Sequence, residues 1–197
     1  MVRHYLRHAH GPAFFIAWLR APLRTGSPVP SGESLARAMA EQVDVNRPGY
    51  IIELGAGTGV VTSALIKAGI PRDRLLVIER NQAFFDLLQE KFPDTQILQQ
   101  DAQKLTQILR QQHIHEINAV VSSLPLLSLP AQVQRNVVEQ VASVLGPDSI
   151  YIQYTYGLLS PVPKRLLHGF SLTGRRVRRI WRNIPPAFIW RYTKKSA

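Results

Sequence analysis

A glycine-rich loop preceded by an acidic residue is the part of this sequence best suited to chemistry. The run, Glu-Leu-Gly-Ala-Gly-Thr-Gly, spans 53–59. Glycines remove side chains, so the backbone can approach a ligand closely and adopt turns that cost other residues free energy. A helix beginning near Thr58 would point its positive N-terminal end at the same place, which favours a ligand carboxylate. The loop therefore predicts a small-ligand site.

Two further acidic residues stand where a nucleoside ligand would need them. Glu79 ends the run LLVIE, twenty residues beyond Gly59. Its carboxylate offers two oxygens in one plane, which can accept hydrogen bonds from both ribose hydroxyls. Asp101 and Ala102 follow the next β-rich run. The structural alternatives are a surface acid beside Arg80 for the first and a helix cap for the second.

Alternating strands and helices must position these residues. The sequence predicts strands at Tyr50–Leu54, Leu75–Glu79, Gln96–Gln99, Ile117–Ser122, Ser149–Tyr156, Arg175–Arg182 and Ala187–Thr193. It predicts helices at Thr58–Ala68, Gln82–Phe92, Leu105–Gln112 and Pro130–Leu145, and one that begins near Pro30-Ser31 and includes Leu35–Met39. Strands separated by helices of this length indicate a mainly parallel sheet with helices on both faces. The last two strands, joined through 183–186, would add an antiparallel hairpin at one edge.

The glycine loop also separates two classes of cofactor. The fingerprint of NAD-binding loops is G-x-G-x-x-G, whereas this loop reads E-x-G-x-G-x-G and resembles motif I of S-adenosylmethionine-dependent methyltransferases. The resemblance implies a Rossmann-like class I methyltransferase with S-adenosylmethionine as cofactor and no metal. It implies that Glu53 positions the ligand amino group, Glu79 binds the ribose and Asp101 the adenine amino group. The cofactor-binding residues expected in this way are Ser31, Glu53, Gly55, Ala56, Gly57, Thr58, Gly59, Glu79, Arg80, Asp101, Ala102 and Ser122.

A short polar segment after the fourth predicted strand is the expected acceptor site. It contains the candidate catalytic residues Ser122, Ser123, Leu124 and Pro125. Amino-methylating members of the superfamily carry a similar motif there, and its polar side chain and nearby carbonyls hold the amine toward the methyl group. Such a site acts mainly by positioning, and the acceptor must lose a proton before or during attack. No dedicated base is identified, and an ordinary strand-to-loop transition is the structural alternative.

The residue after Pro125 bears on the class of acceptor. Enzymes that methylate an extruded base stack it on an aromatic side chain at this position, but here the residue is Leu126. The missing aromatic counts against methylation of adenine in nucleic acid.

The net charge of +11 is concentrated at the two ends of the chain. Residues 1–32 contain four Arg and no acidic residue, and residues 149–197 contain ten Lys or Arg and again no acid. Such ends attract a polyanion, either nucleic acid or an anionic membrane, although solubility alone is an alternative. The longest apolar run, Ala13–Leu19, is too short to span a bilayer, and export is not expected. The absence of cysteine excludes disulfides, thiolate zinc sites and cysteine nucleophiles.

Two terminal segments suit contact with a membrane. Gly11–Ser31 mixes aromatic residues with arginines, as in a helix at a lipid interface, or in one whose aromatics pack over the cofactor. On a strand, Arg176, Arg178 and Arg182 would share one face. These cations could bind lipid headgroups or RNA phosphates equally well.

Several patterns together resemble bacterial phospholipid N-methyltransferases, which methylate phosphatidylethanolamine stepwise toward phosphatidylcholine. They are W-L-R-x-P, G-x-x-x-P-S-x-x-x-L-A-x-x-M, the glycine loop, S-x-L-P and N-I-P-P-A. The resemblance implies a lipid substrate, an anionic phospholipid surface as partner, and a cytoplasmic enzyme peripherally associated with the inner face of the plasma membrane.

We expect one domain over 1–197, with 1–45 as an amphipathic helical extension covering the cofactor site, and a monomer in solution. The alternatives are an rRNA or DNA adenine N6-methyltransferase, another small-amine methyltransferase, or a cofactor-binding membrane module without catalysis.

Overall fold

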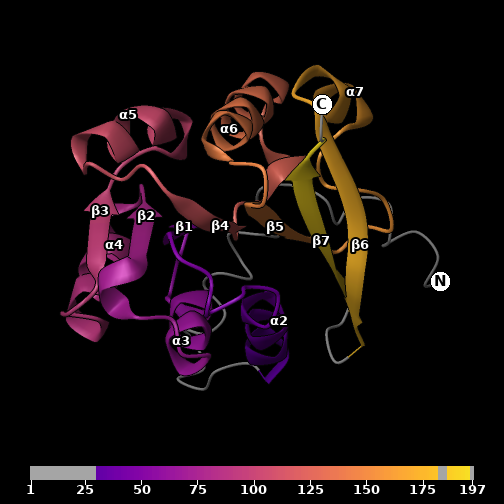
Figure 1. Ribbon diagram of the computed structural model, residues 1–197. Helices are drawn as coiled ribbons and strands as arrows, with labels where there is room; N and C mark the ends of the chain where they lie inside the picture. The colour runs from indigo at the N-terminus through magenta and orange to yellow at the C-terminus, as the bar shows by residue number, and fades with distance from the viewer. Residues whose placement is uncertain (1–29, 182–185, 196–197) are drawn as a thin grey trace.

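The computed structural model describes residues 30–181 and 186–195 and arranges them around one seven-stranded sheet (Figure 1). The strands occur in the order β3-β2-β1-β4-β5-β7-β6, and β7 runs antiparallel to both of its neighbours. Their bounds are β1 Tyr50–Leu54, β2 Leu75–Glu79, β3 Gln96–Gln99, β4 Ile117–Ser122, β5 Ile150–Thr155, β6 Leu172–Ile180 and β7 Ala187–Lys194. The predicted fold, a mainly parallel α/β sheet with a C-terminal antiparallel hairpin, is confirmed.

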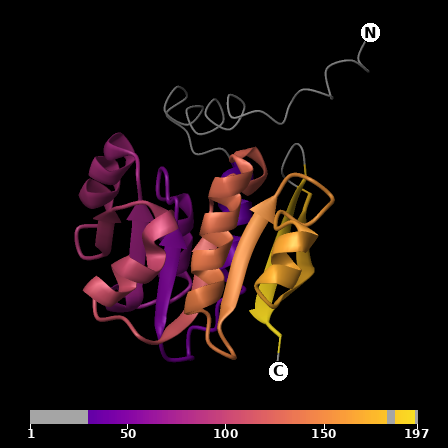
Figure 2. The same cartoon turned by 90° about the horizontal axis from the view of Figure 1, so that it is seen from above.

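Helices cover both faces of the sheet (Figures 1 and 2). One face packs against α2 (Pro30–Ala40), α3 (Val60–Lys67) and α4 (Gln82–Lys91). The other packs against α5 (Leu105–Gln111), α6 (Ala131–Val144) and α7 (Lys164–Gly169). Among the described residues there are also three single 3-10 turns, η2 Arg72–Arg74, η3 Ala102–Lys104 and η4 Leu126–Ser128.

The central strands are apolar because both of their faces are covered. Every residue of β2, β4 and β5 is buried. Parallel strands between two helical layers require such continuous apolar runs, which made these strands easy to predict. Helix α3 starts two residues later than predicted, since Gly59 precedes it with a left-handed φ of 81°.

The β6–β7 hairpin corrects one expectation about the basic C-terminal segment. The pairing register shifts between Arg176 and Arg178, so that Arg176 lies opposite Trp190 while Arg178 lies opposite Ile189. Neighbouring residues on β7 point to opposite faces of the sheet. Arg176 and Arg178 therefore lie on opposite faces, and the prediction that they share one face is wrong. The extra residue between them, Val177, forms a β-bulge that reverses the alternation.

Other predictions fall partly or wholly outside the described residues. The third arginine of that predicted face, Arg182, lies outside them, as does most of the linker 183–186. The same is true of residues 1–29, which include most of the expected N-terminal extension. The helix predicted from Pro30 is confirmed as α2. Within the described ranges, none of the helices has the length and hydrophobicity needed to cross a membrane.

Candidate active site

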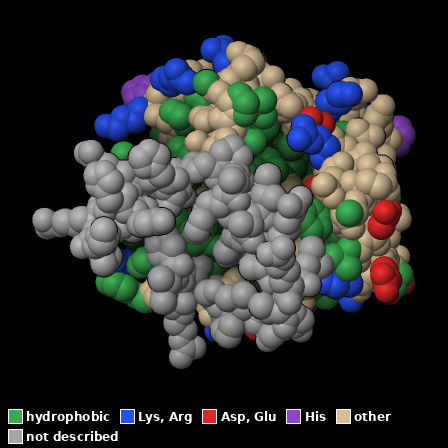
Figure 3. Space-filling model, turned by 180° about the vertical axis from the view of Figure 1, so that it is seen from behind, with side chains coloured by type: hydrophobic (Ala, Val, Ile, Leu, Met, Phe, Trp, Pro, Cys, Tyr) green, Lys and Arg blue, Asp and Glu red, His purple; other side chains and the backbone are tan. Residues whose placement is uncertain are grey.

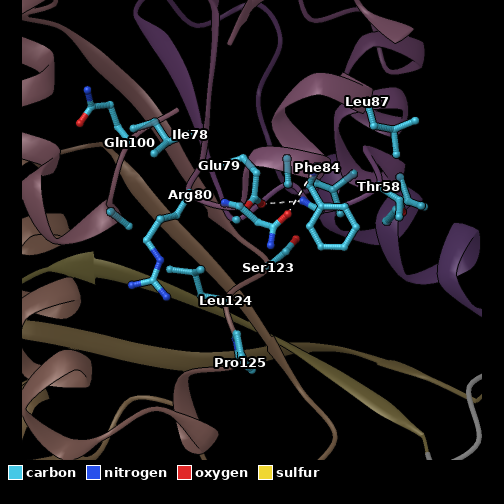
Figure 4. Close-up of a pocket in the computed structure, with 18 of the residues that line it drawn as sticks. Thr58, Ile78, Glu79, Arg80, Phe84, Leu87, Gln100, Ser123, Leu124 and Pro125 are labelled. Atoms are coloured by element: carbon cyan, nitrogen blue, oxygen red, sulfur yellow. Dashed lines mark hydrogen bonds between the residues drawn. The ribbon is translucent and has the colours of Figure 1, made fainter. Parts of the chain in front are cut away.

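A cavity of about 1000 Å³ opens at the carboxyl ends of the parallel strands (Figure 4). Ligands of open α/β sheets bind at this edge, because the loops after successive parallel strands converge there. The loops after β1, β2, β3 and β4 all contribute to the wall. Eleven of the residues expected at the site line the cavity: Gly55, Ala56, Gly57, Thr58, Glu79, Arg80, Asp101, Ala102, Ser123, Leu124 and Pro125.

The glycine loop is shaped by two close approaches. Gly55 has a φ of 70°, and a Cβ at this position would lie 2.5 Å from Cδ2 of Leu124. The loop after β1 thus packs directly against the loop after β4. A Cβ on Gly59 would instead lie 2.6 Å from Cε2 of Phe92, at the end of α4. Gly59 does not line the cavity, and its missing side chain serves the contact between α3 and α4.

Glu53 lies fully buried in β1, next to the glycine loop. Its Oε2 accepts a hydrogen bond from Oγ1 of Thr62 at 2.7 Å, while its Oε1 has no partner. The pKa of Glu53 is raised from 4.5 to about 8, mainly by burial, while the hydrogen bond from Thr62 lowers it and the nearby charge of Glu79 contributes to raising it. Glu53 does not line the cavity. Its carboxyl group lies beneath the glycine loop, and one of its oxygens makes no hydrogen bond.

Glu79 occupies the end of β2 and faces the cavity with both oxygens fixed. Its Oε2 accepts a hydrogen bond from the backbone N–H of Gly57 at 2.9 Å, and Oε1 accepts one from Asn81 at 2.7 Å. Figure 4 shows it near Phe84, across from the loop that carries Ser123. A carboxylate oxygen has two acceptor sites, so each oxygen keeps capacity for one more donor. The two carboxylate oxygens of Glu79 are therefore held in a fixed orientation, and each can accept a further hydrogen bond from a ligand.

Asp101 caps η3 and also lines the cavity. Its Oδ1 accepts from the backbone N–H of Gln103 at 2.9 Å and caps η3. Its Oδ2 lies 3.4 Å from Nη1 of Arg80. Because Asp101 also lines the cavity, capping fixes the carboxylate at its wall. Arg80 is mostly exposed, so this ion pair contributes little to stability.

The two serines after β4 have different surroundings. Ser122 is fully buried, lies outside the cavity wall, and its Oγ accepts from the backbone N–H of Leu124 at 3.3 Å. Ser123 lines the cavity, and its Oγ is buried with no hydrogen-bond partner. The carbonyl of Leu124 already accepts from Gln153 and from Leu126, each at 2.9 Å. Of these groups, the Ser123 hydroxyl is free to bind a ligand.

Leu126 corrects the reasoning about the missing aromatic. Its side chain packs in the core on the α6 face and does not line the cavity. The residue type there consequently says little about the acceptor. Aromatic side chains reach the cavity from elsewhere, namely Phe84 of α4 and Tyr154 of β5.

Several lining residues were missed by sequence reasoning. Helix α2 supplies Gly32, Glu33, Leu35, Ala36 and Met39, and the segment from η4 to α6 supplies Leu129, Val133 and Val137. Their apolar helical spacing looked like ordinary core packing. Tyr154 had a usable signal, since it stands near the end of a predicted strand at the ligand edge. Ser31 belongs to the first turn of α2, and its side chain lies outside the described part.

Comparison with known sequences shows which family this chain belongs to. A family model described as a methyltransferase domain matches residues 51–148. The ornithine lipid N-methyltransferase of Singulisphaera acidiphila is 35% identical over 129 residues, covering 64% of this chain and 67% of that protein. The chain belongs to the class I methyltransferases.

More distant relatives agree with this assignment. The ribosomal RNA small subunit methyltransferase A of a Hydrogenobaculum species is 30% identical over 70 residues, which cover 36% of this chain and 27% of that protein. A TehB-like S-adenosylmethionine-dependent methyltransferase from Corynebacterium glutamicum has a TM-score of 0.61 at 17% identity, covering 95% of this chain and 99% of that one. The 1,6-didemethyltoxoflavin-N1-methyltransferase of Burkholderia thailandensis has a TM-score of 0.65 at 10% identity, covering 93% of this chain and 87% of that one. At these identities the structural likenesses show the fold.

The cofactor of class I methyltransferases, S-adenosylmethionine, fits the residues of this methyltransferase. The cavity has space for a molecule of this size, and Gly55 and Gly57 of the glycine loop bring backbone without side chains to its wall. Glu79 and Asp101 offer carboxylate acceptors at adjacent strand ends, suited to hydroxyl and amino donors. The unpartnered Oε1 of Glu53 adds a buried acceptor beside the loop. These acceptors thus match the hydroxyl and amino donors of a cationic nucleoside.

Proposed function

We propose that this enzyme transfers methyl groups from S-adenosylmethionine to the amino group of phosphatidylethanolamine and its methylated derivatives, while associated peripherally with the cytoplasmic face of a membrane. The observation that carries the proposal is the unpartnered hydroxyl of Ser123 in a largely apolar cavity. The relative that methylates ornithine lipid, another membrane lipid, supports a lipid acceptor.

The cofactor would lie across the strand ends in one orientation. Glu79 would accept from the ribose hydroxyls, and Asp101 would accept from the adenine amino group, with Ala102 and Leu124 against the ring. Gly55, Ala56, Gly57 and Thr58 would line the methionine part. Glu53 and Gly59 would act from below the loop, where they fix its shape. Bound in this way, the sulfonium group supplies an electrophilic methyl to the acceptor side.

The acceptor amine would be held by Ser123. Its Oγ can accept from an amine N–H, which turns the nitrogen lone pair toward the methyl group. The ammonium nitrogen would first lose one proton to solvent, which frees its lone pair, and the nitrogen–carbon bond would then form as the sulfur–methyl bond breaks with its electron pair remaining on sulfur. Ser122 would contribute indirectly, because its Oγ holds the backbone N–H of Leu124 and so fixes the turn. Pro125 restricts the same turn.

Methyl transfer from labelled S-adenosylmethionine to lipid vesicles tests the proposal. We expect labelled product with phosphatidylethanolamine vesicles, and Ser123→Ala should reduce it roughly tenfold, as expected for a lost hydrogen bond to a reacting group, without changing cofactor affinity. Ser143→Ala is the matched control, because that serine is exposed on α6. Labelled product with ornithine lipid and with no phosphatidylethanolamine would show that the lipid substrate is ornithine lipid. Label in ribosomal RNA but in no lipid would overturn the lipid proposal in favour of an RNA substrate.

A further inference from the structure

Four large hydrophobic side chains are exposed on the described surface. They are Leu127, Leu158, Leu159 and Trp181, with exposed fractions of 53%, 69%, 81% and 68%. Single exposed leucines are ordinary. Such a group beside a binding cavity is unusual, because the other large apolar side chains among the described residues are at least partly buried, and it is a candidate interaction site.

The fold places all four residues at one edge of the sheet. Leu127 follows β4, the two leucines follow β5, and Trp181 follows β6. Strands β5 and β6 run in the same direction because each is antiparallel to β7. Their carboxyl ends therefore lie at the edge where the cavity opens. The register supports this, since Thr155 at the end of β5 and Arg179 near the end of β6 both lie opposite Phe188.

Two of these segments are close neighbours. A Cβ built on Gly157 would lie 4.0 Å from Cδ1 of Leu127, and Leu158 directly follows that glycine. Pro125 and Leu129, on either side of Leu127, line the cavity. We call Leu127, Leu158, Leu159 and Trp181 the apolar rim.

Cations flank the apolar rim. The guanidinium of Arg179 lies 3.3 Å from the ring centroid of Trp181, and Arg176 and Arg179 lie 5.1 and 5.3 Å from that of Phe188. Lys164 and Arg165 are exposed where the loop bearing the two leucines enters α7. Figure 3 shows Lys and Arg side chains beside hydrophobic ones on the face it draws.

Few acidic residues are available to pair with these cations. Residues 149–197 contain no Asp or Glu. Among the ion pairs of the described residues, this segment takes part in one, between Arg178 and Glu41 of α2. Arg176 and Arg179 lie on the opposite face of β6 from that pair and are held by aromatic rings, so their charges remain available to an anionic partner.

We propose that the apolar rim inserts into the interface of an anionic lipid bilayer, with Arg176, Arg179, Lys164 and Arg165 at headgroup level, so that the cavity opens onto the lipid surface. Interfacial binding combines buried apolar area with attraction between cations and anionic headgroups, and this surface offers both. Nucleic-acid phosphates would use the cations but would gain nothing from two exposed leucines. The inference rests on the proposed function for the identity of the substrate, though not for the docking itself.

Vesicle co-sedimentation with neutral substitutions tests the rim. We expect wild-type protein to bind vesicles of phosphatidylethanolamine and phosphatidylglycerol, and Leu158→Ser with Leu159→Ser to weaken binding at least roughly tenfold, since two exposed leucines lose their apolar contact with lipid. The matched control is Gln111→Ser with His115→Ser, two exposed residues near the opposite edge of the sheet. Arg176→Gln with Arg179→Gln should reduce the preference for anionic over zwitterionic vesicles.

Methyl transfer to a short-chain phosphatidylethanolamine, dispersed below its micellar concentration, separates docking from chemistry. The leucine variant should keep this activity and its cofactor affinity while losing activity on vesicles. Unchanged vesicle binding by the leucine variant would overturn the docking proposal. Binding of the wild-type protein to RNA that is weakened by the leucine substitutions, with no change in vesicle binding, would overturn it as well. Vesicle binding that depends on the rim without any methylated lipid would uphold docking and refute the proposed substrate.

Discussion

The carboxylate of Glu79 accepts a hydrogen bond from the backbone N–H of Gly57 at 2.9 Å, which ties the end of β2 to the glycine loop after β1. Its other oxygen accepts from the N–H of Asn81. In Glu79→Gln, the amide NH₂ must face one of these two donors. We expect the affinity for S-adenosylhomocysteine, measured by calorimetry, to fall at least roughly tenfold, because hydrogen bonds to a charged group are lost.

Glu90→Gln is the control for this prediction, since it removes the same charge from an exposed position on α4. It should leave the affinity unchanged. Equal affinity in wild-type protein and Glu79→Gln would show that the carboxylate does not bind the cofactor.

Gly55→Ala should damage the site through a steric contact. The new Cβ would meet Cδ2 of Leu124 at 2.5 Å, and a φ of 70° is unfavourable for alanine. The strained backbone alone costs about 1 kcal/mol, and displacement of Leu124 adds to it. We expect a lower free energy of unfolding in denaturant and weaker cofactor binding.

Gly69→Ala isolates the backbone contribution, because Gly69 also has a positive φ, of 95°, but nothing within 4 Å of a Cβ. It should lose stability and keep cofactor affinity. Adding Leu124→Ala to Gly55→Ala should recover part of the excess loss of stability. No recovery would mean that the contact with Leu124 is not the cause.

The sequence predicted the strands well because each central strand is buried on both faces. A continuous apolar run such as Leu75–Glu79 has few other places in a fold of this size. The glycine loop and the acids at 79 and 101 could be located for a related reason, since each lies at or just after the carboxyl end of a predicted strand. Convergence of strand ends then made their proximity predictable.

Tertiary packing decided what the sequence could not. Nothing local distinguishes Val177 as the residue of a bulge, yet it moves Arg178 to the other face of β6. Leu126 points into the core from the turn after β4, and Ser122 is buried as the last residue of β4 itself. The strand end that carries Tyr154 could be read from the sequence, but its place at the cavity also requires β5 to lie beside β4, which depends on contacts far apart in the chain.

The stability of the cofactor-free protein should depend on pH through Glu53. Burial raises the pKa of Glu53 from 4.5 to about 8, so the folded protein holds a proton that the unfolded chain releases near 4.5. The free energy of unfolding attributable to this group therefore falls as pH rises from about 4.5 to about 8 and levels above that. Glu53→Gln cannot ionise and should lack this contribution.

Denaturant unfolding of both proteins at several pH values between 5 and 8.5 measures the effect. The stability of Glu53→Gln relative to wild type should increase with pH over this range. Parallel pH profiles would show that Glu53 ionises normally in the folded protein. Glu90→Gln, at an exposed position, should give a profile parallel to that of wild type.

Asp101→Asn should alter the choice of base in the cofactor. The variant can keep Oδ1 as the cap for Gln103, while the oxygen now 3.4 Å from Arg80 becomes an NH₂ group. If that oxygen accepts from the adenine amino group, the substitution places two donors together. The same NH₂ could instead donate to the carbonyl oxygen of hypoxanthine.

Affinities for S-adenosylhomocysteine and S-inosylhomocysteine, measured by calorimetry, give the selectivity directly. Wild-type protein should prefer the adenine ligand, and Asp101→Asn should lower that preference by roughly tenfold, the size expected for exchange of one hydrogen bond to a charged acceptor. Asp86→Asn, an exposed substitution on α4, should leave the ratio unchanged. If Asp101→Asn weakens both ligands equally, the carboxylate acts on the cap of η3 alone and the adenine lies elsewhere in the cavity.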